Sequence, residues 1–251
     1  MVIAVIGILA ALLLPALVRA RDRAKETVCL GNFRQIGIGL KLYQGDNNDR
    51  YPLGATLISN PGALVPRGTP QQQIWSFTAA LGGKDGKEPL PMQQMLPPAK
   101  ARPLNRYVTE PRSFQCPADG GVDYRANGGP QWDSLWESFG CSYHYNAPGR
   151  GEDSLYRTRI RGKQDDWLSQ PSRFIVLYEP PANRHIWNNI GHYVYWHRSH
   201  PPKTLDNPRL GTADGRLISP ILFADGHAEI VDFTGRADEE NTSSFVWYQP
   251  E

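Results

Sequence analysis

The pattern of hydrophobic and polar positions changes abruptly after residue 18. Residues 1–18 (MVIAVIGILAALLLPALV) contain no charged side chain, whereas residues 19–26 (RARDRAKE) contain six. Beyond them no proline interrupts the chain until residue 52. Apolar side chains recur there every three to five residues, which is typical of one helix face: Val28, Phe33, Ile36, Leu40 and Tyr43. The pattern predicts one continuous helix with an apolar first part and an amphipathic second part, ending near residues 45–49 with Gly45 as its C-terminal cap.

The apolar first part of this helix has three possible destinations. A secretory signal peptide has its positive charges before the apolar run, whereas here they follow it. A buried core helix of this character is unusual in a chain of 251 residues. A membrane span requires about 17–25 mostly apolar residues, so we expect a membrane-embedded or filament-core segment, kinked at Pro15. The other two destinations stay open. The residues expected to face lipid or neighbouring helices are Ile3, Ile6, Leu9, Leu13 and Leu17.

Strand patterns are concentrated in the last third of the chain. Four runs of apolar, aromatic and β-branched residues predict a four-stranded, mostly antiparallel sheet: residues 173–179, 192–197, 220–224 and 228–233. Residues 142–146 also alternate as a strand does. Asp225-Gly226 separates the last two runs of the sheet, and this dipeptide favours a type I′ hairpin turn with positive φ at both positions. His227 completes the turn.

These elements predict an α+β fold made of a long N-terminal helix packed on a sheet. The expected divisions are residues 1–18 as the membrane or filament-core part, 19–48 as the exposed amphipathic part, and 49–251 as a head domain. About 200 residues are enough for one hydrophobic core. The formal net charge of +2 is too small to indicate binding to nucleic acid.

The chain offers weak candidates for chemistry. Asp46 and Asp49 flank two asparagines, and such oxygen ligands suit Ca²⁺, but a polar turn with solvated charges explains them as well. The histidines of the last third show no HExxH spacing, and no Gly-x-Ser-x-Gly is present. We therefore expect structural histidines, no catalytic residues, no cofactor and no enzyme. Aromatic residues between 120 and 138 suggest, as an alternative function, a membrane-anchored exported module that binds a glycan or protein: Tyr124, Trp132 and Trp136.

Three motifs support a resemblance to a known family. They are residues 29–37 (CLGNFRQIG) on the long helix, residues 116–119 (CPAD) and residues 223–227 (FADGH). Together with the apolar N-terminus, they resemble the type IV pilin-like proteins, the prepilin-type cleavage/methylation family that includes the pseudopilins of type II secretion. The N-terminal part of the resemblance is quite specific, whereas each short motif alone is weak.

The resemblance implies a structural subunit that assembles into a pilus-like or pseudopilus filament. It implies a single-pass protein of the bacterial inner membrane, with its head exported to the periplasm or cell surface. The implied partners are membrane lipid, other pilin-like subunits, the prepilin peptidase and the secretion or pilus machinery. The family's basic leader and its Phe-Thr-Leu-Ile-Glu-Leu segment are not found, so we expect the given sequence to start inside the apolar run. The family's histidine nine residues before Asp-Gly is also displaced, and the nearest candidates are His197 and His200.

Three cysteines in an exported chain predict one disulfide bond and one free thiol. A bond between Cys116 and Cys141 would close the glycine-rich loop between them and is the favoured pairing. A bond between Cys29 and Cys116 would tie the helix to the head and is the alternative.

Overall fold

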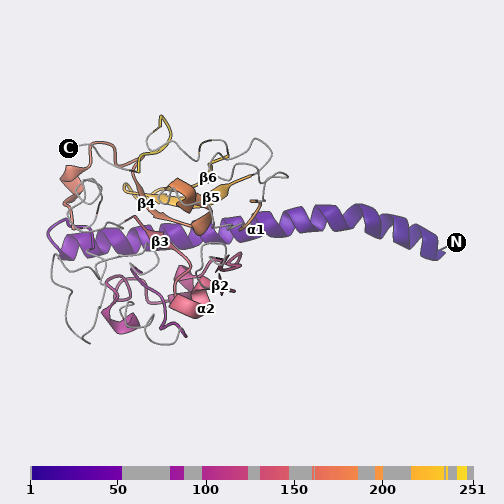
Figure 1. Cartoon of the computed structure of the whole chain (residues 1–251), viewed down its shortest axis with the longest axis horizontal. Coiled ribbons are helices and arrows are strands. Elements are labelled where there is room, and N and C mark those ends of the chain that lie inside the picture. Colours follow the sequence, from indigo (N-terminus) through magenta and orange to yellow (C-terminus); the bar gives the residue numbers. More distant parts are fainter. Residues whose placement is uncertain are drawn as a thin grey trace.

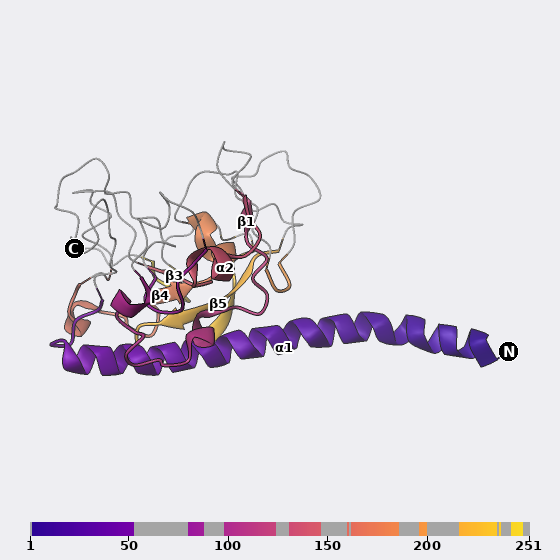
Figure 2. The ribbon, with the colours of Figure 1, turned by 90° about the horizontal axis from the view of Figure 1, so that it is seen from below.

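The computed structural model describes residues 2–52, 80–87, 98–123, 131–146, 160, 162–185, 196–199, 216–234, 236 and 242–247. Within these ranges, the long helix α1 runs without interruption from Val2 to Asp46 and contains Pro15. Its first part extends far beyond the head and curves gently towards the N-terminus (Figures 1 and 2). The continuous helix predicted from the sequence is confirmed.

The C-terminal end of α1 is built by asparagine and aspartate rather than by Gly45. The helix continues through Gly45, and the left-handed residues that follow are Asn48 (φ 54°) and Asp49 (φ 57°). The backbone N–H of Asp49 donates to the carbonyl of Gln44 at 2.9 Å. Asparagine and aspartate tolerate this conformation better than other residues with a Cβ, so the expectation of a glycine cap is wrong.

The head contains a four-stranded antiparallel sheet in the order β3-β4-β5-β6. Its strands are β3 (His144–Tyr145), β4 (Ile175–Tyr178), β5 (Ile218–Phe223) and β6 (Ala228–Asp232). The α+β class with an N-terminal helix and an antiparallel sheet is therefore confirmed. Among the described residues, the fourth strand is β3 and not the run at 192–197. Residues 192–195 of that run lie outside the described ranges, and Trp196 and His197 lie in a coil and a turn.

The hairpin between β5 and β6 is confirmed, but its turn type differs from the prediction. The N–H of Gly226 donates to the carbonyl of Phe223 at 3.0 Å, and the N–H of Phe223 donates to the carbonyl of His227 at 3.0 Å. Gly226 has φ 95°, whereas Asp225 has no positive φ. The chain reverses over more residues than a two-residue type I′ turn, so only the last loop position has to be left-handed.

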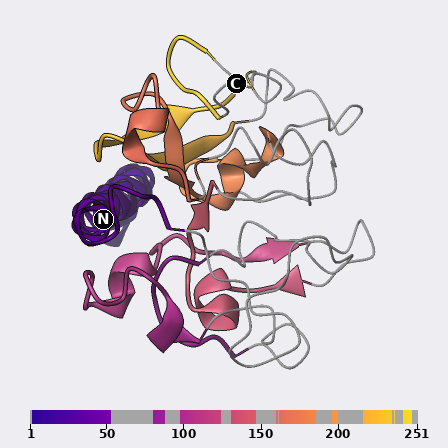
Figure 3. The ribbon, with the colours of Figure 1, turned by 90° about the vertical axis from the view of Figure 1, so that its left-hand side faces the viewer.

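A second group of short elements lies below the sheet in Figure 1, and both lie on the same flank of α1 in Figure 2. It contains β1 (Val122–Asp123) paired with β2 (Gln131–Trp132), and the short helix α2 (Leu135–Phe139). Figure 3, which looks along α1, shows the sheet above the helix and this group below it. Short 3₁₀ helices connect the elements: Ala99–Ala101, Pro111–Phe114, Asp165–Trp167 and Pro180–His185.

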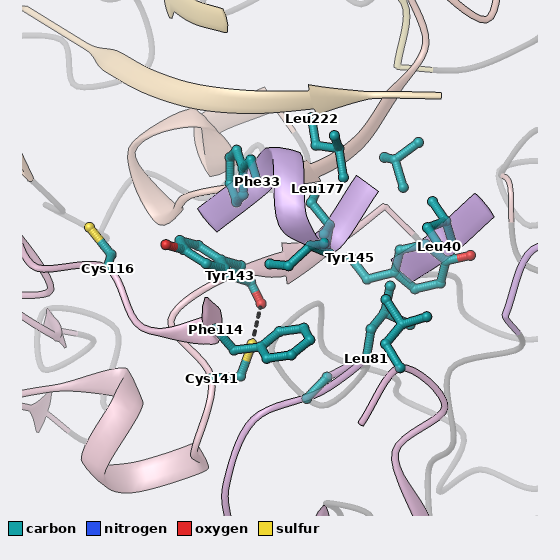
Figure 4. Close-up of a cluster of buried hydrophobic side chains, with 14 of the residues drawn as sticks. Phe33, Leu40, Leu81, Phe114, Cys116, Cys141, Tyr143, Tyr145, Leu177 and Leu222 are labelled. Atoms are coloured by element: carbon teal, nitrogen blue, oxygen red, sulfur yellow. Dashed lines mark hydrogen bonds between the residues drawn. The ribbon is translucent and has the colours of Figure 1, made fainter. Parts of the chain in front are cut away.

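The main hydrophobic core forms where α1 meets both groups. Phe33, Ile36 and Leu40 of α1 are buried in it, together with Tyr143 and Leu222 of the head (Figure 4). A smaller cluster surrounds Ile221, Phe223 and Trp247. β5 contributes neighbouring residues to both clusters, Leu222 to the first and Ile221 and Phe223 to the second. All six residues of this strand are therefore buried, including Ser219.

Candidate functional site

In the first part of α1, residues 2–18, the apolar side chains that the structure describes are not covered by the described part of the head. All five residues that the sequence assigns to a lipid or filament contact are exposed: Ile3, Ile6, Leu9, Leu13 and Leu17. The head sits around the other end of the helix (Figure 2). Among the residues described, none of the helices has both the length and the apolar character needed to cross a membrane.

The second part of α1, residues 26–44, is bound to the head by apolar and polar contacts. Its buried residues are Glu26, Cys29, Phe33, Ile36, Gly37, Gly39, Leu40 and Gln44. Val28, which the sequence pattern places on the packed face, is instead exposed, and the neighbouring Cys29 is buried. The apolar part of the packed face thus begins at Cys29 and not at Val28.

Polar side chains of the second part also contact the head. Asn32 donates to the carbonyl of Gln115 at 2.9 Å and to the hydroxyl of Tyr143 at 3.0 Å. Glu26 pairs with Arg198 through two contacts of 2.6 and 2.9 Å. Paired contacts between a guanidinium and a carboxylate fix orientation as well as distance, so this pair sets the angle at which α1 leaves the head.

Four ligand-type side chains meet beside α1, and we call them the four-residue cluster: Cys29, Cys116, Glu179 and His197. One atom from each lies within 4.8 Å of the others. The sulfur atoms of the two cysteines are 3.1 Å apart, and Cys116 Sγ lies 3.3 Å from His197 Nε2. His197 Nε2 is in turn 2.9 Å from Glu179 Oε2, and both of these side chains are fully buried.

Cys116 is held by the turn of the CPAD motif. The N–H of Ala118 donates to Cys116 Sγ at 3.2 Å, and the N–H of Asp119 donates to the carbonyl of Cys116 at 3.0 Å. The Asp119 carboxylate accepts hydrogen bonds from the backbone N–H groups of Leu135 and Trp136, at 3.0 and 2.7 Å. These N–H groups begin α2 and need an acceptor, so Asp119 anchors the turn to α2.

The other three members come from separate elements. Cys29 faces the head from α1, and Glu179 follows β4, where its own N–H donates to the Ser219 hydroxyl at 3.2 Å. His197 lies in a turn with φ 54°, a conformation that is uncommon for residues with a Cβ. Its neighbours are both fixed, since Trp196 donates to the carbonyl of Gly121 at 3.0 Å and Arg198 pairs with Glu26.

The electrostatics of the cluster follow from its burial. Burial alone would lower the pKa of His197, but the charge of Glu179 and the hydrogen bonds around the ring outweigh it and raise that pKa to about 10. Burial, then the contact with Cys29 and the charge of Glu179, raise the pKa of the Cys116 thiol well above its ordinary value. Without a further cation, these shifts favour a protonated imidazole at His197 and a protonated thiol at Cys116.

The remaining residues predicted from the sequence lie elsewhere. Asp46 accepts a hydrogen bond from the Tyr107 hydroxyl at 2.8 Å. Among the described residues, neither Asp46 nor Asp49 belongs to a group of three metal-ligand side chains. Asp225 Oδ1 lies 2.6 Å from His227 Nδ1, and the His227 ring stacks on Phe223, so these two residues act within the hairpin turn.

The sequence favours Cys141 as the partner of Cys116, but the structure places Cys116 against Cys29. The Cys141 thiol donates to the carbonyl of Tyr143 at 3.3 Å, and its sulfur lies apart from that of Cys116 in Figure 4. All three cysteines are free thiols. The pair brought together is thus the one that the sequence analysis kept as its alternative.

Two of the three aromatic residues proposed as a binding platform are buried. Trp132 and Trp136 each keep only 6% of their surface exposed, and Trp132 packs edge-on against Phe139 at 4.9 Å. Tyr124 lies outside the described residues. These two tryptophans therefore stabilise the head and present little surface to a glycan or protein.

Sequence reasoning missed the four-residue cluster as a unit. Its members are separated by 87, 63 and 18 positions along the chain, so no short spacing of the kind that marks a zinc finger is present. The available signal was that both cysteines lie within the motifs CLGNFRQIG and CPAD.

Comparisons of the chain with family models, with curated proteins and with solved structures find no match. The resemblance to pilin-like proteins, and the activity that it implies, therefore stay predictions.

Proposed function

We propose that this chain is a pilin-like assembly subunit whose apolar helix end packs against the same helix end of further subunits. The observation that supports the proposal is the division of α1 into an exposed apolar part and a part bound to the head. The charged residues at 19–26 lie between the two parts. A subunit of this form presents a helix to its neighbours while its head stays folded independently of them.

The physical driving force is burial of the exposed apolar side chains. Transfer of one fully exposed leucine or isoleucine from water to an apolar environment is worth about 1.5–3 kcal/mol. The first part of α1 exposes ten large apolar side chains, each by more than half of its surface. An environment that surrounds the helix is needed to cover them, because they are not confined to one face. Packed helices of other subunits provide such surroundings after assembly, and lipid provides them before it.

The proposal extends to the setting that the family resemblance implies. The subunit is held in the bacterial inner membrane before assembly, its head is exported to the periplasm or cell surface, and a prepilin peptidase processes its leader. Its role is structural, through helix packing, with no catalytic residue involved. The secretion or pilus machinery moves the subunit from the membrane into the filament.

Two matched double variants of the full chain test the proposal. Leu9→Glu/Leu13→Glu places two carboxylates on the apolar part, and Ile38→Glu/Leu42→Glu places two on the solvent face of the part bound to the head. The exposed fractions are 54% and 66% for the first pair and 65% and 54% for the second. Both pairs have the same i, i+4 spacing, so the charge repulsion that they introduce within the helix is also the same.

The measurement is the mass of the particles by light scattering, with detergent and after its removal. We expect the unsubstituted chain and the Ile38/Leu42 variant to form large assemblies when detergent is removed, and the Leu9/Leu13 variant to assemble far less. A monodisperse monomer of the unsubstituted chain in plain buffer would refute the proposal. Equal loss of assembly in both variants would refute the assigned role of residues 2–18.

A further inference from the structure

The most unusual feature of the core is a fully buried pair of ionisable side chains, Glu179 and His197. Glu179 Oε2 lies 2.9 Å from His197 Nε2, and both side chains are fully buried. Among the described residues, the other oxygen of Glu179, Oε1, and the other ring nitrogen of His197, Nδ1, have no hydrogen-bond partner. Buried polar atoms without a partner are unfavourable. The two nearest further groups are thiol sulfurs, which are weak acceptors and weak donors.

We propose that Cys29, Cys116, Glu179 and His197 bind one zinc ion, which fastens α1 to the head. Two sulfurs, one imidazole nitrogen and one carboxylate oxygen are ligands that Zn²⁺ accepts in a four-coordinate site. Ligand atoms at ordinary zinc bond lengths stand about 3.3–3.8 Å from one another in a tetrahedron. The adjacent pairs lie at 3.1, 3.3 and 2.9 Å, so the ligand atoms must move apart by up to about 0.7 Å to admit the ion.

Binding of the ion would release protons from the cluster, because both thiols and the imidazole Nε2 must lose a proton before they can act as ligands. The two positive charges of the ion would then offset two of the three negative charges on the two thiolates and Glu179. The N–H of Ala118, which already points at Cys116 Sγ, stabilises thiolate charge as outer groups do in metal sites. The imidazole binds through Nε2, which is the nitrogen that faces both Cys116 and Glu179.

A disulfide bond between Cys29 and Cys116 is the competing explanation. Their sulfur atoms are 3.1 Å apart, which is about 1 Å longer than a disulfide bond. Such a bond would explain why the two cysteines are close together. It would not explain why Glu179 and His197 are buried beside them. A metal ion accounts for all four side chains, and on this ground we favour it.

The position of the cluster indicates a structural site and not a catalytic one. All four ligands come from the protein, whereas a catalytic zinc keeps one position open for water or substrate. The ligands come from α1, the CPAD turn, the end of β4 and the turn at His197, so one ion would connect the helix to both groups of the head (Figure 3). This role is separate from the assembly function proposed above and holds whether or not the subunits polymerise.

The test is zinc binding by the full chain, purified in detergent under reducing conditions. The reduced protein is stripped with a chelator and titrated with Zn²⁺ in competition with a chromophoric chelator. The unsubstituted chain should bind one zinc ion per chain. Each of Cys29→Ser, Glu179→Gln and His197→Gln should weaken binding by more than the 10- to 100-fold that loss of an outer-shell contact costs.

Two matched variants serve as controls. Cys141→Ser removes the third buried thiol, and His227→Gln removes an exposed histidine, and neither residue belongs to the cluster. Both controls should bind zinc as the unsubstituted chain does. If Cys141→Ser loses zinc as Cys29→Ser does, the assignment of ligands is wrong.

A second measurement does not depend on whether the variants fold. Co²⁺ added to the unsubstituted reduced chain should give the intense visible and near-ultraviolet absorption of tetrahedral cobalt with thiolate ligands. Zn²⁺ should abolish that absorption. Absence of the absorption would overturn the proposal. Isolation of the protein with peptides of Cys29 and Cys116 linked under non-reducing digestion would overturn it as well.

Discussion

The two parts of α1 belong to one helix and differ in what covers them. Residues 2–18 are apolar on every face, and all of those whose side chains are described are exposed. Residues 26–44 alternate between buried and exposed positions with the period of a helix, and the buried positions face the head. The boundary lies at the charged segment 19–26, where Glu26 pairs with Arg198.

The comparison shows what the distribution of apolar residues around a helix indicates about the surface that covers the helix. A one-sided apolar stripe needs one covering surface, and the head of the same chain provides it through Phe33, Ile36 and Leu40. An all-round apolar segment needs cover on every side, and the described head does not provide it. Under our proposal, that cover comes from lipid and from other subunits, so the two parts of α1 should respond differently to the same substitution.

The largest difference is expected when one leucine in each part is truncated. Leu40 is buried and Leu13 is exposed. Leu40→Ala should lower the free energy of unfolding of the head by about 2–5 kcal/mol, because it leaves a cavity in the core. Leu13→Ala should leave that free energy unchanged. Denaturant unfolding in the same detergent, followed by the fluorescence of the buried tryptophans, measures both; equal losses would contradict the division of α1.

Glycine-to-alanine substitutions should change the stability of the head in one part of α1 and the helix content in the other. A Cβ added at Gly39 would come within 2.4 Å of Val108 Cγ2, whereas one added at Gly7 would meet nothing within 4 Å. Gly39→Ala should therefore destabilise the head by about 1–3 kcal/mol through overpacking. Gly7→Ala should raise the helix content of the detergent-bound chain, since alanine favours a helix by up to about 1 kcal/mol, without changing the unfolding of the head.

A third variant controls for the position of the glycine. Gly31 lies in the part bound to the head, but a Cβ there would also meet nothing within 4 Å. Gly31→Ala should be neutral or slightly stabilising. If Gly31→Ala destabilises the head as Gly39→Ala does, the loss of stability arises from any alanine in this part of the helix and not from the contact with Val108.

Much of the fold could be predicted from local patterns in the sequence. The long helix follows from the apolar run 1–18 and from the absence of proline between residues 16 and 51. The strands β4, β5 and β6 follow from apolar runs bounded by turn residues. The hairpin follows from Asp225-Gly226, but the turn type does not, because it depends on how many residues leave the ladder between Leu222 and Ala228. The choice of β3 as the fourth described strand depends on pairing between residues 32 or 34 positions apart, which a local pattern does not determine.

The candidate site was far less predictable than the fold. Which cysteine faces Cys116 depends on how α1 is rotated about its axis against the head. The apolar pattern does not determine that rotation to within one residue. The sequence pattern places Val28 on that face, whereas the structure exposes Val28 and buries Cys29. Glu179 and His197 reach the cluster through the path of β4 and of a turn, and neither path can be read from spacing alone.

The smallest predicted effect concerns Asp165, which contacts the C-terminal end of α1. Its carboxylate accepts hydrogen bonds from Lys41, Gln44 and the Tyr51 hydroxyl at 3.1, 3.2 and 2.5 Å. Burial alone would raise the pKa of Asp165, but these bonds outweigh it and hold that pKa below its ordinary value. A lowered pKa in the folded state contributes stability that is complete above the unfolded value of about 3.9 and is lost as the pH falls towards the folded value. Because the side chain is 41% exposed, we expect the loss below about pH 4 to be under about 1 kcal/mol. Asp165→Asn should lower the free energy of unfolding at neutral pH and weaken its dependence on pH below about pH 4. Asp166→Asn, a substitution of the exposed neighbour, serves as the control and should behave as the unsubstituted chain does. If the free energy of unfolding depends on acid pH in the same way in all three chains, this contact does not fasten the helix end.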